Sequence, residues 1–370
     1  MQPPPLGLYI HLPWCARKCP YCDFNSHEQD VIPEQAYIEQ LLQDLEQDLR
    51  HIGERRVDTL FIGGGTPSLF SAQSIQRLLR EIDNTLPLSA DLEATLEANP
   101  GSAEAEKFAA FRQAGINRLS LGIQSFDERS LRELGRVHSA DEAHAAIGPA
   151  RSAGFDNLNL DLMHGLPGQS VEAAGADLDC AIRHAPAHLS WYQLTIEPNT
   201  VFHKRPPLLP VEDTLADIQQ AGELRLAQAG YTQYEVSAYH RPGSQCRHNL
   251  NYWAFGDYLG IGAGAHGKLT LADGRVLRTA KRRQPAEYLA SAPQRLAADT
   301  RVLGEQDLVG EYMMNALRLN AGFRLCDFSA RTGLAADVLA PQLESLCARE
   351  LLERHGEEVQ TCLLYTSDAA

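Results

Sequence analysis

The stretch that decides the fold lies near the start of the chain and reads Gly7-Leu-Tyr-Ile-His-Leu-Pro-Trp-Cys15-Ala-Arg-Lys-Cys19-Pro-Tyr-Cys22. Its first residues, Gly7–Leu12, form a short apolar run that predicts a buried strand. The next element is predicted to be a helix that opens at Pro33, because apolar residues follow at three- and four-residue spacing and would place one apolar face against a sheet. A strand, a loop and an amphipathic helix in this order predict the first βα unit of a parallel sheet.

The same alternation continues along the chain. We predict further strands at Val57–Ile62, Leu92–Glu97, Asn117–Gly122, Asp156–Met163 and His188–Thr195, each separated from the next by a helical segment. Ser139 and Glu142 form a capping box at one helix start, and Gly115, Gly154 and Gly230 are predicted helix stops. Eight units would close a full barrel, so six units predict an open, partial (β/α)6 barrel whose site lies at the carboxyl ends of its strands.

Length and composition limit the class of protein. A chain of 370 residues, 44% hydrophobic and 22% charged, is typical of a globular protein with two domains or one large α/β domain and an appendage. The net charge of −15 argues against a nucleic-acid partner, and the basic cluster Lys281–Arg283 is too short to change that. Because Met1–Pro13 lacks the pattern of a signal peptide and no apolar run has the length of a membrane span, we expect a cytoplasmic protein.

We predict four segments. Residues 1–239 hold the partial barrel, residues 240–302 form a Gly- and aromatic-rich extension, residues 303–362 form a small helical, winged-helix-like domain, and residues 363–370 are a tail without a recognisable pattern. The helical segments predicted in the small domain include Leu325–Thr332, Ala335–Cys347 and Glu350–Glu353. Gly260, Gly262 and Gly264 superficially match a dinucleotide-binding loop, but Lys268–Arg278 predicts a hairpin instead of the helix that such a loop requires.

The strongest chemical signal is the spacing Cys15-x3-Cys19-x2-Cys22. Eight cysteines in 370 residues are too sparse for a disulfide scaffold, so a tight group of three indicates a metal site. A structural zinc site would need a fourth ligand, and no second pair of cysteines or histidines at suitable spacing supplies it. A [4Fe–4S] cluster normally takes four cysteines, so three would leave one iron free to hold a small molecule.

This cysteine spacing, with an aromatic residue before the last cysteine, resembles the signature of the radical S-adenosylmethionine (SAM) superfamily. The resemblance implies a [4Fe–4S] cluster on Cys15, Cys19 and Cys22, with SAM bound to the free iron. It also implies that the run Gly63–Pro67, which follows the second predicted strand, contacts the methionine part of SAM. On the residues alone, this run could equally be a tight turn.

Within that superfamily the chain resembles the coproporphyrinogen dehydrogenase-like branch, the HemN/HemW family. The resemblance implies SAM contacts at Tyr9, Tyr21, Gly64, Gly65, Thr66, Glu97, Gln124, Arg136 and Asp161. The residues by themselves leave two structural alternatives open. Glu97 could form a scaffold ion pair with Arg136, and Asp161 could cap a helix.

The segment His248-Asn-Leu-Asn-Tyr-Trp253 fits the HNxxYW pattern of the HemW group of this family. The resemblance implies that His248, Tyr252 and Trp253 bind heme, with His248 as the ligand of the heme iron. Imidazole is a standard axial ligand and aromatic rings offer flat apolar surface to a porphyrin. Cys246 is a nearby second ligand, His266 and His164 are alternative ligands, and a histidine buried in the core is the structural alternative.

The function implied by the resemblance to the HemW group is that of a heme chaperone. Its partners would be heme and heme-accepting proteins, some of them at the membrane. The resemblance leaves open whether the protein forms a homodimer. The alternative is a radical SAM oxidoreductase, the oxygen-independent coproporphyrinogen III oxidase, which decarboxylates porphyrinogen propionates. Two departures disfavour the oxidase: Phe24 stands where the oxidases carry a further cysteine, and only 14 residues precede Cys15 where they have a long extension. Radical chemistry on another substrate is a third alternative.

Overall fold

The computed structural model describes residues 3–101 and 105–362. Its central feature is a twelve-stranded sheet in the order β14-β13-β12-β11-β1-β4-β5-β6-β7-β8-β10-β9. The parallel part consists of β1 (Leu6–Leu12), β4 (Val57–Gly64), β5 (Leu88–Ala98), β6 (Arg118–Gln124), β7 (Asn157–His164) and β8 (His188–Gln193). These strands are the six that the sequence predicts, so the open (β/α)6 barrel is confirmed, with β5 longer at its start than expected.

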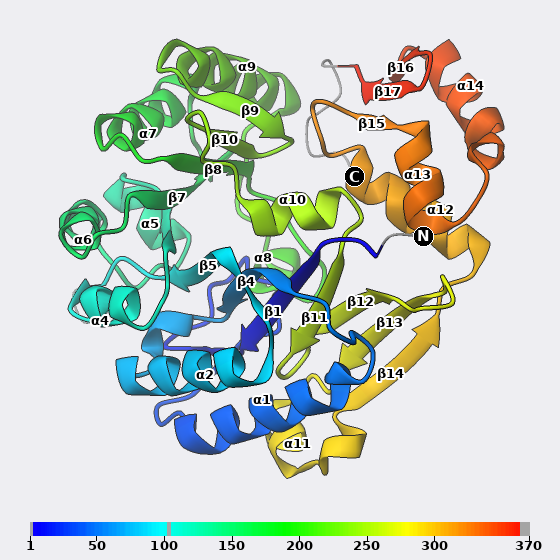
Figure 1. The fold of residues 1–370 in the computed structure, drawn as a ribbon. Coiled ribbons are helices and arrows are strands. Elements are labelled where there is room, and N and C mark those ends of the chain that lie inside the picture. Colours follow the sequence, from blue (N-terminus) through cyan, green and yellow to red (C-terminus); the bar gives the residue numbers. More distant parts are fainter. Residues whose placement is uncertain (1–2, 102–104, 363–370) are drawn as a thin grey trace.

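Helices follow the strands and lie along the outside of the curved sheet (Figure 1). They are α1 (Glu34–Leu49), α2 (Ala72–Thr85), α4 (Phe108–Gln113), α5 (Glu128–Glu133), α6 (Ala140–Ser152), α7 (Val171–Arg183), α8 (Val201–Lys204) and α9 (Glu212–Gln228). The predicted capping box begins α6, where the Glu142 N–H donates to Ser139 Oγ and the Ser139 N–H donates to the Glu142 carboxylate. After α6, Gly154 has a φ of +87°, which glycine adopts without the steric cost of a side chain.

The extension widens the same sheet instead of forming a separate layer. Its strand β11 (Asp257–Ile261) pairs parallel with β1, and β12 (His266–Thr270), β13 (Val276–Lys281) and β14 (Ala297–Val302) continue antiparallel. The hairpin predicted over Lys268–Arg278 is therefore confirmed. At the opposite edge β10 (Ala238–His240) and β9 (Thr232–Glu235) add to β8. Helix α10 (Arg247–Trp253) contacts β1, β4 and α12 (Glu305–Ala316), and α11 (Pro285–Ala290) contacts α1.

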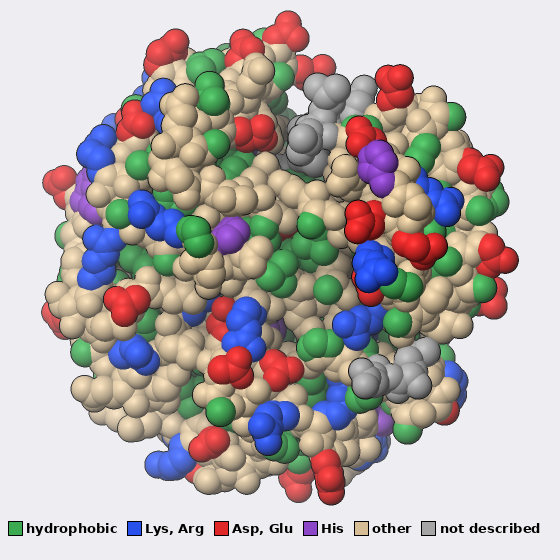
Figure 2. Space-filling model, turned by 45° about the horizontal axis from the view of Figure 1, so that its top comes forward, with side chains coloured by type: hydrophobic (Ala, Val, Ile, Leu, Met, Phe, Trp, Pro, Cys, Tyr) green, Lys and Arg blue, Asp and Glu red, His purple; other side chains and the backbone are tan. Residues whose placement is uncertain are grey.

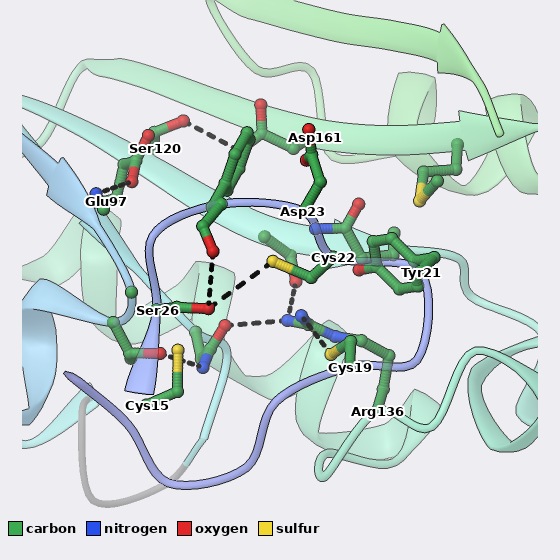
Figure 3. Close-up of a pocket in the computed structure, with 18 of the residues that line it drawn as sticks. Cys15, Cys19, Tyr21, Cys22, Asp23, Ser26, Glu97, Ser120, Arg136 and Asp161 are labelled. Atoms are coloured by element: carbon green, nitrogen blue, oxygen red, sulfur yellow. Dashed lines mark hydrogen bonds between the residues drawn. The ribbon is translucent and has the colours of Figure 1, made fainter. Parts of the chain in front are cut away.

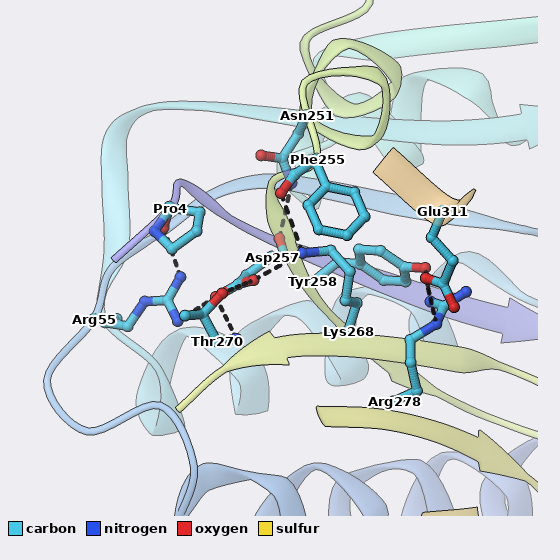
Figure 4. Close-up of polar contacts among 10 residues, drawn as sticks. All are labelled: Pro4, Arg55, Asn251, Phe255, Asp257, Tyr258, Lys268, Thr270, Arg278 and Glu311. Carbon is cyan, nitrogen blue, oxygen red and sulfur yellow. Dashed lines mark hydrogen bonds and ion pairs between the residues drawn. The ribbon is translucent and has the colours of Figure 1, made fainter. Parts of the chain in front are cut away.

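Buried ion pairs hold the extension against the barrel. The carboxylate of Asp257, at the start of β11, lies 2.8 Å from Arg55 and 3.2 Å from Lys268 (Figure 4). On the other side of the hairpin, Lys281 Nζ lies 2.6 Å from Asp44 and 2.8 Å from Asp48, both in α1. Removing one partner of such a buried pair leaves an uncompensated charge, so these contacts determine where the extension sits.

The C-terminal region has its own apolar core. Its helices are α12 (Glu305–Ala316), α13 (Leu325–Thr332) and α14 (Ala340–Ala348), and its sheet has the order β15 (Phe323–Arg324), β17 (Glu358–Thr361), β16 (Leu352–His355). The core includes Tyr312, Phe328 and Val359. The helical prediction for Glu350–Glu353 is wrong, because Glu350 has a φ of +57° and the chain then enters β16. Segment 335–347 is divided between a short 3₁₀ turn at Ala336–Leu339 and α14.

Two features of the surface bear on partners. Acidic and basic side chains are interspersed over the face drawn in Figure 2 and do not separate into regions of one sign. Among the helices of residues 3–101 and 105–362, none is both long and apolar enough to cross a membrane. The predicted tail, 363–370, lies outside the described residues.

Candidate functional site

A cavity of about 560 Å³ lies at the carboxyl ends of the barrel strands, where the predicted barrel would place its site. The three clustered cysteines line it (Figure 3). So do all the predicted SAM contacts except Tyr9, namely Tyr21, Gly64, Gly65, Thr66, Glu97, Gln124, Arg136 and Asp161. The fold thus brings together residues that are dispersed along the first half of the chain. We call this space the first cavity.

The cysteines stand on a loop that is closed at its base. Two short strands, β2 (Trp14–Cys15) and β3 (His27–Glu28), pair parallel there, and Lys18 Nζ donates to the carbonyls of Phe24 and Ser26 across the loop at 3.0 and 3.2 Å. Burial raises the pKa of the Cys15 and Cys22 thiols. These thiols are therefore protonated at neutral pH unless a cation compensates for the charge of the thiolate.

The three cysteines fit an iron–sulfur cluster by donor type and by the cavity that they share. Thiolates are the usual ligands of such clusters, and three of them supply one ligand fewer than a [4Fe–4S] cluster takes. Cys22 Sγ lies 3.7 Å from Ser26 Oγ, and Arg136 Nη1 lies 3.6 Å from Cys19 Sγ. The described residues contain no group of three His, Cys, Asp or Glu side chains close enough to hold a metal ion, so the thiols would have to converge on the cluster.

The glycine run at the end of β4, Gly63–Gly65, supports the backbone that leads to Cys15. Gly64 has a φ of +120°, and a Cβ placed on Gly65 would lie 2.4 Å from the carbonyl oxygen of Trp14. The Gly65 N–H donates to the Leu12 carbonyl at 2.8 Å and the Thr66 N–H to the Trp14 carbonyl at 2.7 Å. Any side chain at Gly65 would therefore push this wall of the first cavity apart from the cysteine loop.

Two carboxyl groups face each other across the floor of the first cavity. Glu97 accepts a hydrogen bond from the Gly64 N–H at 3.1 Å, while Asp161 accepts from Ser120 Oγ at 2.9 Å and from Asn159 Nδ2 at 2.8 Å. Burial, and then the charge of Asp161, raise the pKa of Glu97 to about 8. At neutral pH Glu97 is thus largely protonated and can donate a hydrogen bond as well as accept one.

Both structural alternatives for these residues are wrong. Asp161 lies inside β7 and caps no helix. Instead of pairing with Glu97, Arg136 donates from Nη2 to Asn99 Oδ1 at 2.7 Å and to the Gly122 carbonyl at 2.8 Å. The guanidinium thus bridges the ends of β5 and β6 beside the cysteine loop.

Two residues that line the first cavity were missed at the level of sequence. Asn99 holds both Arg136 and Thr66 Oγ1, and Tyr192 donates from its hydroxyl to Gln124 Oε1 at 2.8 Å. Asn99 could have been predicted, because it comes two residues after Glu97, at the end of the same predicted strand. Tyr192 could not, because nothing in the sequence distinguishes it from the other aromatic residues. Gln124 itself has a φ of +65°, a strained value that often accompanies a functional site.

A second cavity, of about 820 Å³, adjoins the first and shares Phe24, Gly64 and Glu97 with it. Tyr252 and Trp253 of α10 line this second cavity, as predicted for an aromatic binding surface. Tyr9 lines this second cavity and not the first, with its hydroxyl 2.9 Å from His11 Nδ1. The two cavities therefore lie side by side across β1 and β4.

His248 is not placed as an iron ligand would be. Its Nδ1 lies 2.8 Å from Thr59 Oγ1, its Nε2 lies 2.8 Å from the Tyr252 hydroxyl, and its ring stacks on Phe61. The side chain is 1% exposed, lines neither cavity, and burial lowers its pKa to about 3. In this structure His248 instead orients Tyr252, one helical turn further along α10.

The other predicted iron ligands differ in their placement. Cys246 is fully buried, with Sγ 3.8 Å from Glu93, and His164 is buried against Trp191, so neither lines the second cavity. His266, at the start of β12, does line it. Sequence proximity to Tyr252 and Trp253 therefore does not identify the histidines that line the same cavity, His11 and His266.

Comparison with known proteins shows the family of the chain. Residues 9–181 match the radical SAM superfamily, and residues 303–361 match the HemN C-terminal domain. A protein of Escherichia coli (strain K12) named heme chaperone HemW is 52% identical over 94% of this chain and 92% of its own length. The Bacillus subtilis protein of the same name is 34% identical over 95% of this chain and 93% of its own length.

One solved structure shares the fold of nearly the whole chain. It is coproporphyrinogen III oxidase (HemN) from Escherichia coli, a radical SAM enzyme, with a TM-score of 0.81 over 97% of this chain and 87% of that chain. The two sequences are 24% identical, so this likeness shows the architecture alone. It covers both the barrel and the C-terminal region described above.

Proposed function

The chain belongs to the HemW family of radical SAM proteins, and on that premise we propose that it is a heme chaperone, which binds heme and passes it to acceptor proteins. The observation that carries the proposal is the second cavity. It offers Tyr252 and Trp253 to a flat apolar molecule and opens beside the cavity of the three cysteines.

The first cavity is proposed to hold the [4Fe–4S] cluster on Cys15, Cys19 and Cys22, with SAM beside it. A cluster and SAM together supply a one-electron source and an organic radical. The residues of the chain bind and orient: Gly65 lets the cavity wall pack against the backbone of the cysteine loop, protonated Glu97 offers a hydrogen-bond donor, and Arg136 offers a cation near Cys19. This arrangement suits a zwitterionic amino-acid moiety such as that of SAM.

The roles of the two cavities can also be combined in an enzyme. A porphyrinogen in the second cavity would lie next to the radical source in the first, because Phe24, Gly64 and Glu97 line both. Oxidative decarboxylation of porphyrinogen propionates is therefore the second candidate. The cytoplasmic location, the homodimer and acceptor proteins at the membrane stay predictions.

One experiment separates the two functions. The protein is reconstituted with iron and sulfide under anaerobic conditions and titrated with hemin, and the Soret band is followed. A chaperone binds hemin saturably, and Trp253→Ala weakens binding because it removes one aromatic wall. The control is Trp191→Phe, which should leave binding unchanged because Trp191 packs against Gly222 of α9 and does not line the second cavity. Incubation with coproporphyrinogen III, SAM and a reductant is the second arm. Vinyl-bearing product without saturable hemin binding would establish the oxidase instead.

A further inference from the structure

The second cavity has a wall formed by the extension strands, and one histidine there is unengaged. His266 is exposed, and neither of its ring nitrogens forms a hydrogen bond within the part of the chain that the structure describes. The other histidine that lines this cavity, His11, has both nitrogens occupied, Nδ1 by the Tyr9 hydroxyl and Nε2 by the carbonyl of Asn25 at 2.9 Å. Of the two histidines that line this cavity, His266 is therefore the one whose imidazole is available to a metal.

The protonation state of His266 suits a ligand. Partial burial lowers its pKa, and the nearby charges of Arg278 and Arg283 lower it further. A neutral imidazole offers the lone pair that iron takes from a histidine, whereas an imidazolium does not. Burial first, and the two arginines after it, therefore favour the neutral ring.

The same wall also carries a free cation. Most basic side chains that line the second cavity are already paired. Figure 4 shows Lys268 with Asp257, and Arg278 with Glu311 and the Tyr258 hydroxyl. Lys281 pairs with Asp44. Arg283 is exposed and forms no ion pair with any described residue. An unpaired guanidinium at the rim of an aromatic cavity is suited to a carboxylate on a flat ligand.

Heme matches all three features of this cavity. Its flat apolar ring suits the aromatic wall, its iron takes an imidazole such as that of His266, and its propionates suit Arg283. Accepting the heme-binding function proposed above, we propose that heme binds in the second cavity with His266 as its iron ligand and Arg283 as the partner of a propionate. In this arrangement His248 acts as a positioning residue, because its Nε2 is hydrogen-bonded to the hydroxyl of Tyr252. The axial ligand then comes from the extension and not from the HNxxYW segment.

Three porphyrin ligands test separately the iron contact of His266 and the propionate contact of Arg283. Hemin reports iron ligation and carboxylate binding together, metal-free protoporphyrin IX reports carboxylate binding alone, and hemin dimethyl ester reports ligation alone. His266→Ala should weaken hemin binding by about tenfold or more and move the Soret band, while protoporphyrin IX binds as before. Arg283→Gln should weaken hemin and protoporphyrin IX about tenfold but leave the dimethyl ester unaffected. His203→Ala and Arg205→Gln, exposed residues remote from the cavity, are the matched controls.

The outcomes distinguish the inference from the function on which it rests. If the wild type does not bind hemin saturably, the proposed function fails. If the wild type binds and both variants bind like it with an unchanged Soret band, the function stands and this inference is overturned. A Soret change in His248→Gln, with His266→Ala unchanged and both variants folded by circular dichroism, would likewise assign the ligand to His248.

Discussion

The two cavities are neighbours but are assembled in different ways. The first is lined by residues between Cys15 and Glu197, which lie on the cysteine loop and at the carboxyl ends of successive barrel strands. The second takes its walls from β1, from the extension strands β11–β13 and from α10 and α12, so its residues run from Tyr9 to Asn315. The first cavity follows from the regular repetition of βα units, whereas the second depends on how an irregular segment folds back over the first strand.

This difference explains why one cavity was predicted better than the other. In a parallel barrel every strand end meets at one rim, so polar residues after successive strands converge without further information. No comparable rule places α10 or the β12–β13 hairpin. The aromatic residues of the second cavity were predicted through a local pattern, whereas His248, which belongs to the same pattern, does not line that cavity.

The largest effect should come from the cysteine loop. Cys19→Ser removes one of three thiolates, so anaerobic reconstitution should yield no stable cluster, as measured by bound iron and sulfide and by charge-transfer absorbance. Hemin titration of the same variant should be unchanged, because Cys19 does not line the second cavity. Cys326→Ser, an exposed cysteine in α13, is the control. Loss of hemin binding along with the cluster would mean that the two cavities work as one site.

The next effect concerns the wall of the second cavity. Lys281→Ala leaves Asp44 and Asp48 buried without their cation, so the free energy of unfolding should fall by about 3–5 kcal/mol in urea titrations. The exposed pair of Arg275 and Asp273 lies in the same hairpin, and Arg275→Ala should cost only about 0–1 kcal/mol. Equal losses in the two variants would contradict the role assigned to burial.

A pH-dependent effect should distinguish the floor of the first cavity. The pKa of Glu97 is about 8 in the folded chain and 4.5 in the unfolded chain. Its contribution to stability is therefore complete below the unfolded value and lost as pH rises through the folded one. Glu97→Gln cannot ionise, so its free energy of unfolding in urea should rise relative to that of the wild type by about 3–5 kcal/mol between about pH 5 and pH 9. A difference independent of pH, like that expected of the exposed Glu46→Gln, would argue against a buried, protonated Glu97.

The smallest effect lies outside both cavities. Ser139→Ala removes the capping hydrogen bond of α6 and should lower the free energy of unfolding by about 1 kcal/mol. Cluster content and hemin affinity should both stay at the wild-type level. A change in either would show that helix α6 is coupled to the sites, which the geometry gives no reason to expect.

The predictions from sequence succeeded where local chemistry decides structure. The strand order, the capping box at Ser139 and the gathering of three thiols in one cavity follow from periodicity, from backbone hydrogen bonding and from the scarcity of cysteine. The helical prediction at Glu350–Glu353 failed because a residue with positive φ at Glu350 ends the helix and a short hairpin follows. Tyr9 lines the second cavity, which shares Glu97 with the first, and its contact with SAM stays a prediction.

The sequence by itself determined the open barrel, the cysteine loop and the polar rim, because each depends on residues whose spacing matches one element or one repeated unit. Only the tertiary structure decided which histidine faces the aromatic cavity. His248 has the adjacent position in sequence, but packing of α10 on β4 turns its ring toward Thr59 and Phe61, while β12 carries His266 to the open side. Such a choice depends on side-chain direction after packing, which no spacing of residues along the chain contains.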